Sequence, residues 1–165
     1  MKPLQLSEEL YGYRLQHCPP LTPTQQGLIE TTSRRADSMM QISPDQGAFM
    51  GMIVSLTGAR RILEVGTYTG YSALTMAMSL PADGQLITMD VNAETTAIAR
   101  AAFEKAGVGA KIQTRLGPAE ATLGTLLHER GPGSFDLAFI DADKDNLQVY
   151  YERCLELIRR NDLIM

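Results

Sequence analysis

Residues 61–72 read RILEVGTYTGYS, an apolar run that leads directly into two glycines and then into a helical segment. This order predicts a strand, a glycine turn and a helix, which together form the entrance of a nucleotide-type pocket. A second apolar run, 86–89, ends in Asp90, twenty residues past Gly70. A carboxylate at the tip of a strand can accept hydrogen bonds from ribose hydroxyls, so Asp90 is a candidate ligand contact.

A third apolar run, 137–140, ends in a segment with three carboxylates, DADKD at 141–145. If the three runs are parallel strands, their carboxyl ends lie at one edge of the sheet, where open α/β sheets place their binding sites. The sequence therefore predicts a site at this edge that is assembled from three acidic strand tips.

Strands and helices alternate strictly after residue 61. We predict strands at 62–66, 86–90, 111–115 and 136–140, and helices at 6–16, 24–37, 44–57, 70–80, 93–106, 118–129 and 145–159. Ser43, Pro44 and Gln46 predict a capping box at the start of the third helix. The alternation favours an α/β fold with a doubly wound, mainly parallel sheet and helices on both faces.

Length and composition suit a single domain, 1–165, with a helical region at 1–60 and a sheet region at 61–165. The 15 basic and 19 acidic residues give a formal charge of −4 without a basic cluster, which disfavours a nucleic-acid partner. The apolar stretches are strand-sized, so we expect no membrane segment and a cytoplasmic protein. The isolated Cys18 and Cys154 suit reduced thiols.

The last residues, Leu163-Ile164-Met165, read as the opening of a fifth strand. A parallel strand of about five residues needs more chain than this. A sheet cut at this point would also expose a long apolar edge, which natural domains usually pair, cover or charge. We therefore expect the 165 residues to be part of a longer protein, with the sheet incomplete at its C-terminal side.

The glycine turn lacks the middle glycine of the dinucleotide fingerprint, because Gly66 and Gly70 are separated by Thr67-Tyr68-Thr69. That spacing argues against the pyrophosphate of NAD or FAD, which approaches the backbone at the missing glycine. Glu64, two residues before Gly66, would repel phosphate but suits a cationic ligand such as the amino group and sulfonium of S-adenosylmethionine. The alternative is a packing turn without a ligand.

Several features occur together in one known family: Glu64-x-Gly66-x-x-x-Gly70, Asp90, GPA at 117–119, FIDADKDN at 139–146 and MQISPDQG at 40–47. With this ordered set the chain resembles the class I S-adenosylmethionine-dependent O-methyltransferases. More narrowly, it resembles the cation-dependent group that contains the catechol and caffeoyl-coenzyme A O-methyltransferases, from about residue 39 to residue 165. The resemblance implies a Rossmann-like fold with a lid of N-terminal helices, and a homodimer.

The resemblance also implies which residues contact the cofactor, S-adenosylmethionine: Met40, Ile42, Glu64, Gly66, Thr67, Tyr68, Ser72, Asp90, Ala119, Asp141 and Asp143. Glu64, the backbone of Gly66 and Thr67, and Ser72 would hold the methionine portion. Asp90 would bind the ribose, and the backbone at Ala119 would meet the adenine. Met40 and Ile42 would approach the cofactor from the lid.

The acidic loop offers hard oxygen ligands, which Mg²⁺ or Ca²⁺ prefers. The resemblance selects Asp141 as the metal ligand and Lys144 as the base that removes the hydroxyl proton. A lysine is mostly protonated at neutral pH, so this role requires a lowered pKa or a metal-acidified hydroxyl. The alternative is a solvated helix start, which we prefer for Asp145 and Asn146.

The family's other two metal ligands are an Asp-Asn pair directly after the fifth strand, which this sequence does not reach. Asn161-Asp162 cannot replace that pair, because it precedes the strand that we expect at Leu163. If Met165 is the true end of the protein, we expect an incomplete metal site and little activity.

Three hypotheses follow. In the first, the chain is a magnesium-dependent O-methyltransferase that acts on a small aromatic vicinal diol, free or carried on a larger acyl group. In the second, it methylates another substrate class without a metal. In the third, it is a truncated fold that binds the cofactor without catalysis.

Overall fold

The computed structural model describes residues 6–165 and contains one sheet of five parallel strands in the order β3-β2-β1-β4-β5. The strands are β1 (Arg61–Val65), β2 (Gln85–Asp90), β3 (Ile112–Leu116), β4 (Phe135–Ile140) and β5 (Ile158–Ile164). The strand order reverses at β1, because β2 and β3 lie on one side of it and β4 and β5 on the other. This arrangement confirms the doubly wound parallel sheet predicted from the sequence.

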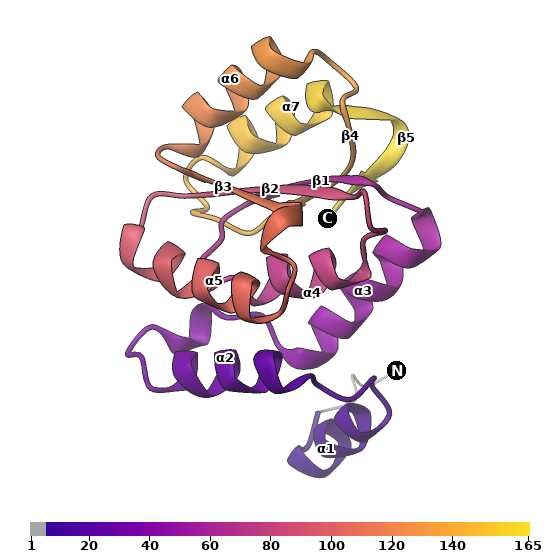
Figure 1. The fold of residues 1–165 in the computed structure, drawn as a ribbon, viewed down its shortest axis with the longest axis vertical. Helices are drawn as coiled ribbons and strands as arrows, with labels where there is room; N and C mark the ends of the chain where they lie inside the picture. The colour runs from indigo at the N-terminus through magenta and orange to yellow at the C-terminus, as the bar shows by residue number, and fades with distance from the viewer. Residues whose placement is uncertain (1–5) are drawn as a thin grey trace.

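Helices cover both faces of the sheet (Figure 1). They are α1 (Glu8–Gln16), α2 (Pro23–Ser33), α3 (Pro44–Thr57), α4 (Tyr71–Ser79), α5 (Ala93–Lys105), α6 (Ala119–Arg130) and α7 (Leu147–Leu157), with short 3₁₀ turns η1 (Ser38–Met40) and η2 (Gly109–Lys111). Helices α3, α4 and α5 lie on one face, with α2 and α1 beyond them, and α6 and α7 lie on the other (Figure 1). The carboxyl ends of the strands therefore open between two helical layers.

Both faces of the central strands are buried, which is why these strands read as continuous apolar runs. Ile62 packs into the cluster under α3, α4 and α5, together with Leu74 and Phe103. Leu63 points the other way, into the cluster under α6 and α7, together with Leu123. Successive side chains of a strand alternate between faces, so β1 contributes to both cores and is fixed between them.

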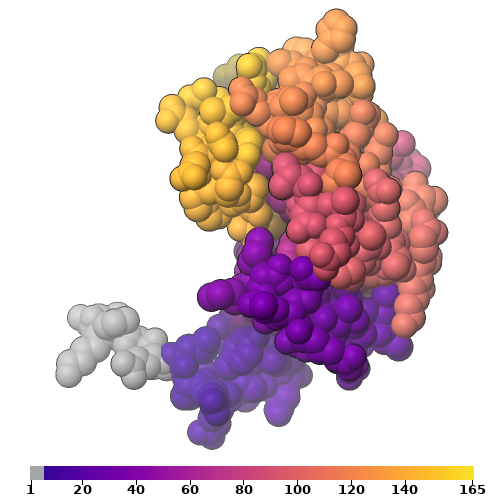
Figure 2. Space-filling view, turned by 90° about the vertical axis from the view of Figure 1, so that its left-hand side faces the viewer, coloured from indigo at the N-terminus to yellow at the C-terminus, as the bar shows by residue number. Residues whose placement is uncertain are grey.

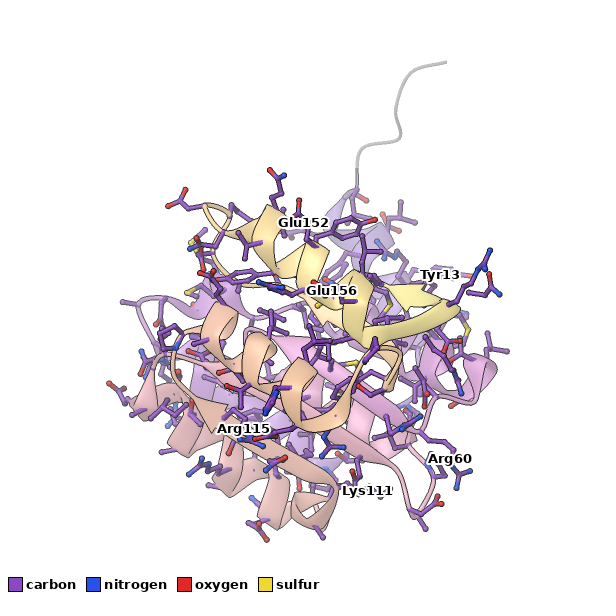
Figure 3. All side chains as sticks on the ribbon, turned by 90° about the horizontal axis from the view of Figure 1, so that it is seen from above. Tyr13, Arg60, Lys111, Arg115, Glu152 and Glu156 are labelled. Carbon is purple, nitrogen blue, oxygen red and sulfur yellow. The ribbon has the colours of Figure 1, made fainter. Side chains whose placement is uncertain are left out.

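Helix α7 shows how a single pattern of residues places a helix on this sheet. Tyr150, Cys154 and Leu157 are buried at the helical spacing of four and three residues. Glu152 and Glu156 are exposed on the same helix (Figure 3). The buried side of α7 packs on β4, so the chain between these two elements passes along the edge where the strands end.

The capping box predicted at Ser43 and Gln46 is wrong, because the Ser43 side chain makes no cap hydrogen bond. The Ser43 hydroxyl instead faces Asp45, and it lowers the pKa of that carboxyl. A capping box does form at α2, where Thr22 and Gln25 bond reciprocally. The bounds of α3, however, match the predicted helix 44–57.

Two boundaries differ from the prediction by more than two residues. Helix α2 ends at Ser33 rather than at residue 37, because the following chain turns into η1. Strand β5 begins at Ile158, where we predicted helix, and Ile158 pairs with Phe135. The pairing is then irregular, with Asn161 at φ 72°, before Leu163 pairs with Leu137. The strand therefore starts earlier than the sequence suggested, and Asn161 and Asp162 belong to it.

Asp136 at the start of β4 ties the amino ends of two strands together. Its side chain is 7% exposed, and its Oδ2 accepts hydrogen bonds from the backbone amides of Arg60 and Arg61, each at 2.8 Å. Arg159 of β5 lies 3.1 Å from Asp136 Oδ1.

Within residues 6–165, no helix has both the length and the apolar character that crossing a membrane would require.

We expect Asp136→Ala to lower the free energy of unfolding by about 2–3 kcal/mol, because it removes a buried carboxylate that accepts from two backbone amides and pairs with the more exposed Arg159. Urea denaturation followed by circular dichroism measures the change. Asp83→Ala, which breaks the exposed ion pair between Asp83 and Arg60, is the control and should leave the urea midpoint nearly unchanged. Equal midpoints for the two variants would contradict the role of Asp136.

Candidate functional site

A pocket of about 610 Å³ lies at the carboxyl edge of the sheet, where the strand order reverses. Its walls come from η1 and the residues after it, the turn after β1, the tip of β2, the turn before α6 and the loop after β4. The hollow between the N-terminal helical segment and the C-terminal α7 region is visible in Figure 2. The predicted site residues in its lining are Met40, Ile42, Gly66, Thr67, Tyr68, Ser72, Asp90, Ala119, Asp141, Asp143 and Lys144.

The turn after β1 approaches the chain after β4 so closely that it requires glycine. Gly66 has φ 99°, and a Cβ on it would lie 2.2 Å from the carbonyl oxygen of Asp141. Gly70 has φ 88°, and a Cβ there would lie 2.6 Å from the Cβ of Ala99. Both glycines are therefore fixed by sterics and by backbone conformation. The turn therefore brings the backbone of residues 66–68 to the pocket.

Asp90 holds the glycine turn in place. Its Oδ2 accepts hydrogen bonds from the backbone amides of Thr67 at 3.0 Å and Tyr68 at 2.7 Å, and its Oδ1 accepts one from Asn92 at 2.8 Å. A carboxylate has about four acceptor positions, so Asp90 retains capacity for a ligand hydroxyl. The sequence predicted the position of Asp90 but not this structural role.

Glu64 lies beneath the turn, is fully buried and is absent from the lining of the pocket. Its Oε2 accepts a hydrogen bond from the hydroxyl of Thr88 at 2.6 Å, and the Thr88 hydroxyl lies 2.5 Å from that of Thr67. Its Oε1 is buried without a hydrogen-bond partner among residues 6–165. A buried, unpaired carboxyl oxygen is costly, which suits a site that receives a cationic ligand.

The electrostatics of Glu64 follow from this burial. Burial raises the pKa of Glu64 to about 7, and the hydroxyls of Ser72 and Thr88 oppose part of the shift. The charges of Asp141 and Asp90 raise that pKa further. A positively charged group beside Oε1 would favour the ionised carboxylate and lower the pKa again.

The three carboxylates after β4 separate into different roles. Asp141 lies 3.3 Å from the Nζ of Lys144, and both line the pocket. Asp143 closes the turn before α7: its Oδ1 accepts from the backbone amide of Asn146 at 3.0 Å, and its Oδ2 accepts from the hydroxyl of Tyr150 at 2.6 Å. These bonds hold the pKa of Asp143 below its ordinary value, with Tyr150 contributing most. Asp145 is exposed and outside the pocket lining.

The part of the chain that the structure describes does not complete a metal centre. No group of three or more His, Cys, Asp or Glu side chains that could hold a metal occurs within residues 6–165. Asp162 pairs with Arg159 at 2.8 Å, and Arg159 in turn pairs with Asp136 near the amino ends of the strands. The pair Asn161-Asp162 therefore lies away from Asp141, as the sequence predicted, although it falls within β5 and not before it.

Several pocket residues were not predicted from the sequence. Gln41 and Tyr71 line the pocket and have buried side-chain oxygens without a partner among the described residues. Tyr150 lies in the lining and holds Asp143. Tyr71 follows the glycine turn directly and Tyr150 is seven residues past Asp143, so both positions could have been found from the motifs that surround them.

Comparison with known proteins identifies the family. A family model described as O-methyltransferase matches residues 19–165. A caffeoyl-CoA O-methyltransferase of Zea mays is 42% identical, over 99% of this chain and 64% of the relative. The chain thus spans less than two thirds of that relative's length.

Solved structures share the fold. The crystal structure of an O-methyltransferase from Bacillus cereus in complex with SAH is 32% identical with a TM-score of 0.85, over 93% of this chain and 69% of that one. An SAH-bound methyltransferase of Podospora anserina is 31% identical with a TM-score of 0.87, over 99% of this chain and 71% of that one. The sheet, the glycine turn and the sequence matches agree, and the chain belongs to the O-methyltransferase family.

Proposed function

We propose that this chain binds S-adenosylmethionine in the pocket at the carboxyl edge of the sheet and transfers its methyl group to a hydroxyl of a small aromatic vicinal diol, assisted by a divalent cation. The observation that carries the proposal is Glu64, a fully buried carboxyl with one unpartnered oxygen under the glycine turn. That arrangement fits a ligand with a positive charge. The relatives, which include caffeoyl-CoA O-methyltransferases and SAH-bound enzymes, support the substrate and cofactor classes.

In this proposal the pocket residues, with Glu64 buried beneath them, divide between the parts of the cofactor. Residues around the turn hold the methionine portion: Glu64, Gly66, Thr67, Tyr68 and Ser72. Asp90 offers its remaining acceptor position to the ribose, and the backbone at Ala119 meets the adenine. Met40 and Ile42 cover the cofactor from the helical segment, and Asp143 positions the loop after β4.

The chemistry requires an oxygen nucleophile directed at an electrophilic methyl group. S-adenosylmethionine supplies that methyl group on a sulfonium. Lys144 lies in the pocket wall, 3.3 Å from Asp141. The ammonium of this ion pair must first give up its own proton, and the neutral amine would then take the proton of the substrate hydroxyl. The pocket between two helical layers would orient the acceptor beside the cofactor, which contributes to rate by positioning.

Asp141 would contribute one carboxylate ligand to the divalent cation. We propose Mg²⁺ as this cation, because it prefers oxygen ligands. The described residues do not provide a full set of ligands for this cation. A second candidate is methyl transfer without a metal, in which Asp141 keeps its ion pair with Lys144. The proposal also includes a cytoplasmic homodimer with residues 1–60 as lid and dimer region, which rests on the family resemblance.

The proposal is tested by calorimetric titration of S-adenosylmethionine, followed by Mg²⁺ and catechol with chromatographic detection of methylated product. We expect cofactor binding, and slow product formation that a chelator suppresses. A folded chain that does not bind the cofactor would contradict the site. Product formation that survives the chelator would favour the metal-independent candidate, and binding without any product would favour a non-catalytic fold.

Asp90→Ala should weaken cofactor binding by at least about tenfold, because it removes a ribose acceptor and frees the turn amides of Thr67 and Tyr68. Calorimetry measures the dissociation constant. Asp83→Ala is the matched control, since it removes the same charge from an exposed pair outside the pocket. Unchanged affinity of the Asp90 variant, in a chain with an unchanged melting temperature, would exclude Asp90 from the site.

From the raised pKa of Glu64 we predict that the affinity for the cofactor depends on pH. Its raised pKa of about 7 leaves the carboxyl mostly protonated at pH 5.5, whereas pairing with a cation requires the ionised form. Affinity for S-adenosylmethionine should therefore rise several-fold between pH 5.5 and 7.5. In Glu64→Gln the affinity should be lower at pH 7.5 and nearly independent of pH over this range. Parallel pH profiles for the two proteins would show that Glu64 does not meet the ligand's charge.

A further inference from the structure

The segment between α2 and α3 lies along the pocket, and its two methionines are little buried, although Ile42 packs against the core. Met40, Gln41 and Ile42 line the pocket, yet Met39 is 92% exposed and Met40 is 60% exposed. A segment with few buried apolar contacts opens readily unless other interactions hold it. Polar contacts must therefore supply much of what keeps residues 38–42 over the pocket.

Those contacts converge on Asp37, the residue before η1. The Tyr68 hydroxyl donates to Asp37 Oδ1 at 2.7 Å and lies 3.1 Å from the Asp37 carbonyl oxygen. Arg35 donates to the Asp37 carboxylate from Nε at 2.9 Å, and to Glu94 of α5 from Nη1 at 2.6 Å. We call Arg35, Asp37, Tyr68 and Glu94 the Asp37 cluster. It joins the segment after α2 to the glycine turn and to the start of α5.

Tyr68 links this cluster to the floor of the pocket. Its backbone amide is held by Asp90 at 2.7 Å, while its hydroxyl reaches Asp37. Tyr68 also has φ 48°, a conformation that non-glycine residues rarely adopt and that persists only where surrounding contacts enforce it. The side chain therefore spans from the turn to the segment that covers it, with both ends fixed.

We propose that Asp37 is a positioning residue that, through the Tyr68 hydroxyl, keeps residues 38–42 closed over the pocket and slows release of the cofactor and its demethylated product. This inference rests on the proposed function, because it assigns the closed segment to cofactor retention. Asp37 does not line the pocket itself and acts through Tyr68, which does, and through the chain that follows Asp37.

The charges support a cluster that persists at neutral pH. Arg35 and the Tyr68 hydroxyl lower the pKa of Asp37, so its carboxylate stays ionised well below neutrality. Burial and the neighbouring Asp37 raise the pKa of Tyr68, so its hydroxyl remains a donor. Arg35 and Glu94 form a more exposed ion pair, which by itself contributes little. The hydrogen bond from the Tyr68 hydroxyl to the Asp37 carboxylate is therefore the contact whose removal tests the role of the cluster.

The experiment compares Tyr68→Phe, Asp37→Ala and the double variant by two measurements. The first is hydrogen exchange of the backbone amides of residues 38–42 in the chain without cofactor. The second is the dissociation rate of S-adenosylhomocysteine, measured by displacement in a stopped-flow instrument. Tyr13→Phe, at an exposed tyrosine of α1 outside the pocket lining, and Asp83→Ala are the matched controls (Figure 3).

We expect each single variant to speed exchange and product release by about tenfold, the effect of one charge-assisted hydrogen bond, and the double variant to add little. The controls should match the wild-type chain. Unchanged exchange in the single variants, or additive effects in the double variant, would overturn the proposal. Faster exchange with unchanged release would reduce the cluster to a structural role and overturn it as well.

The two proposals fail in distinguishable ways. If the wild-type chain does not bind S-adenosylhomocysteine, the proposed function fails and cofactor retention with it, although exchange still reports whether Asp37 closes the segment. If the wild-type chain binds but the variants release product at the wild-type rate, only the role of Asp37 fails.

Discussion

The structure depends on a backbone contact between two parallel strands that end side by side. The amide of Asp141 donates to the carbonyl oxygen of Val65 at 2.8 Å, and the next residue of that turn, Gly66, leaves no room for a side chain against Asp141. The chain after β1 continues into a helix on one face of the sheet and the chain after β4 into a helix on the other. The space between the two departing chains is the pocket, so its position follows from the topology.

Around that contact the fold places a carboxyl group in a costly position. The apolar clusters on both faces of β1 bury Glu64 completely, and the hydroxyl of Thr88 donates a short hydrogen bond to it. The surrounding packing is what keeps the group there, because burial of an unpaired polar atom opposes folding. A ligand with the right charge would relieve that cost, whereas a neutral one would not. Selectivity at this site can therefore come from the buried residue as much as from the pocket lining.

The sequence predicted the sheet and most of the pocket because both depend on local patterns. Strands buried on two faces appear as apolar runs, and the glycine turn, Asp90 and Asp141 stand where such strands end. Side-chain contacts between residues far apart in the chain could not be predicted from the sequence. The Tyr68 hydroxyl donates a hydrogen bond to Asp37, 31 positions away in the sequence, and no local pattern near either residue indicates this contact. The capping box at Ser43 was wrong for a related reason, since the Ser43 hydroxyl faces Asp45 instead of the helix amides.

The irregular pairing of β5 affects how this edge of the sheet meets other chains. A regular edge strand offers a row of free backbone groups on which another strand can assemble. In β5 the register shifts between its contacts at Phe135 and Leu137, with Asn161 in a left-handed conformation. The residues around this shift, 159–162, are exposed and polar or charged. The first half of β5 is thus a poor template for edge-to-edge aggregation, and only the stretch from Leu163 onward is regular enough to accept a further strand.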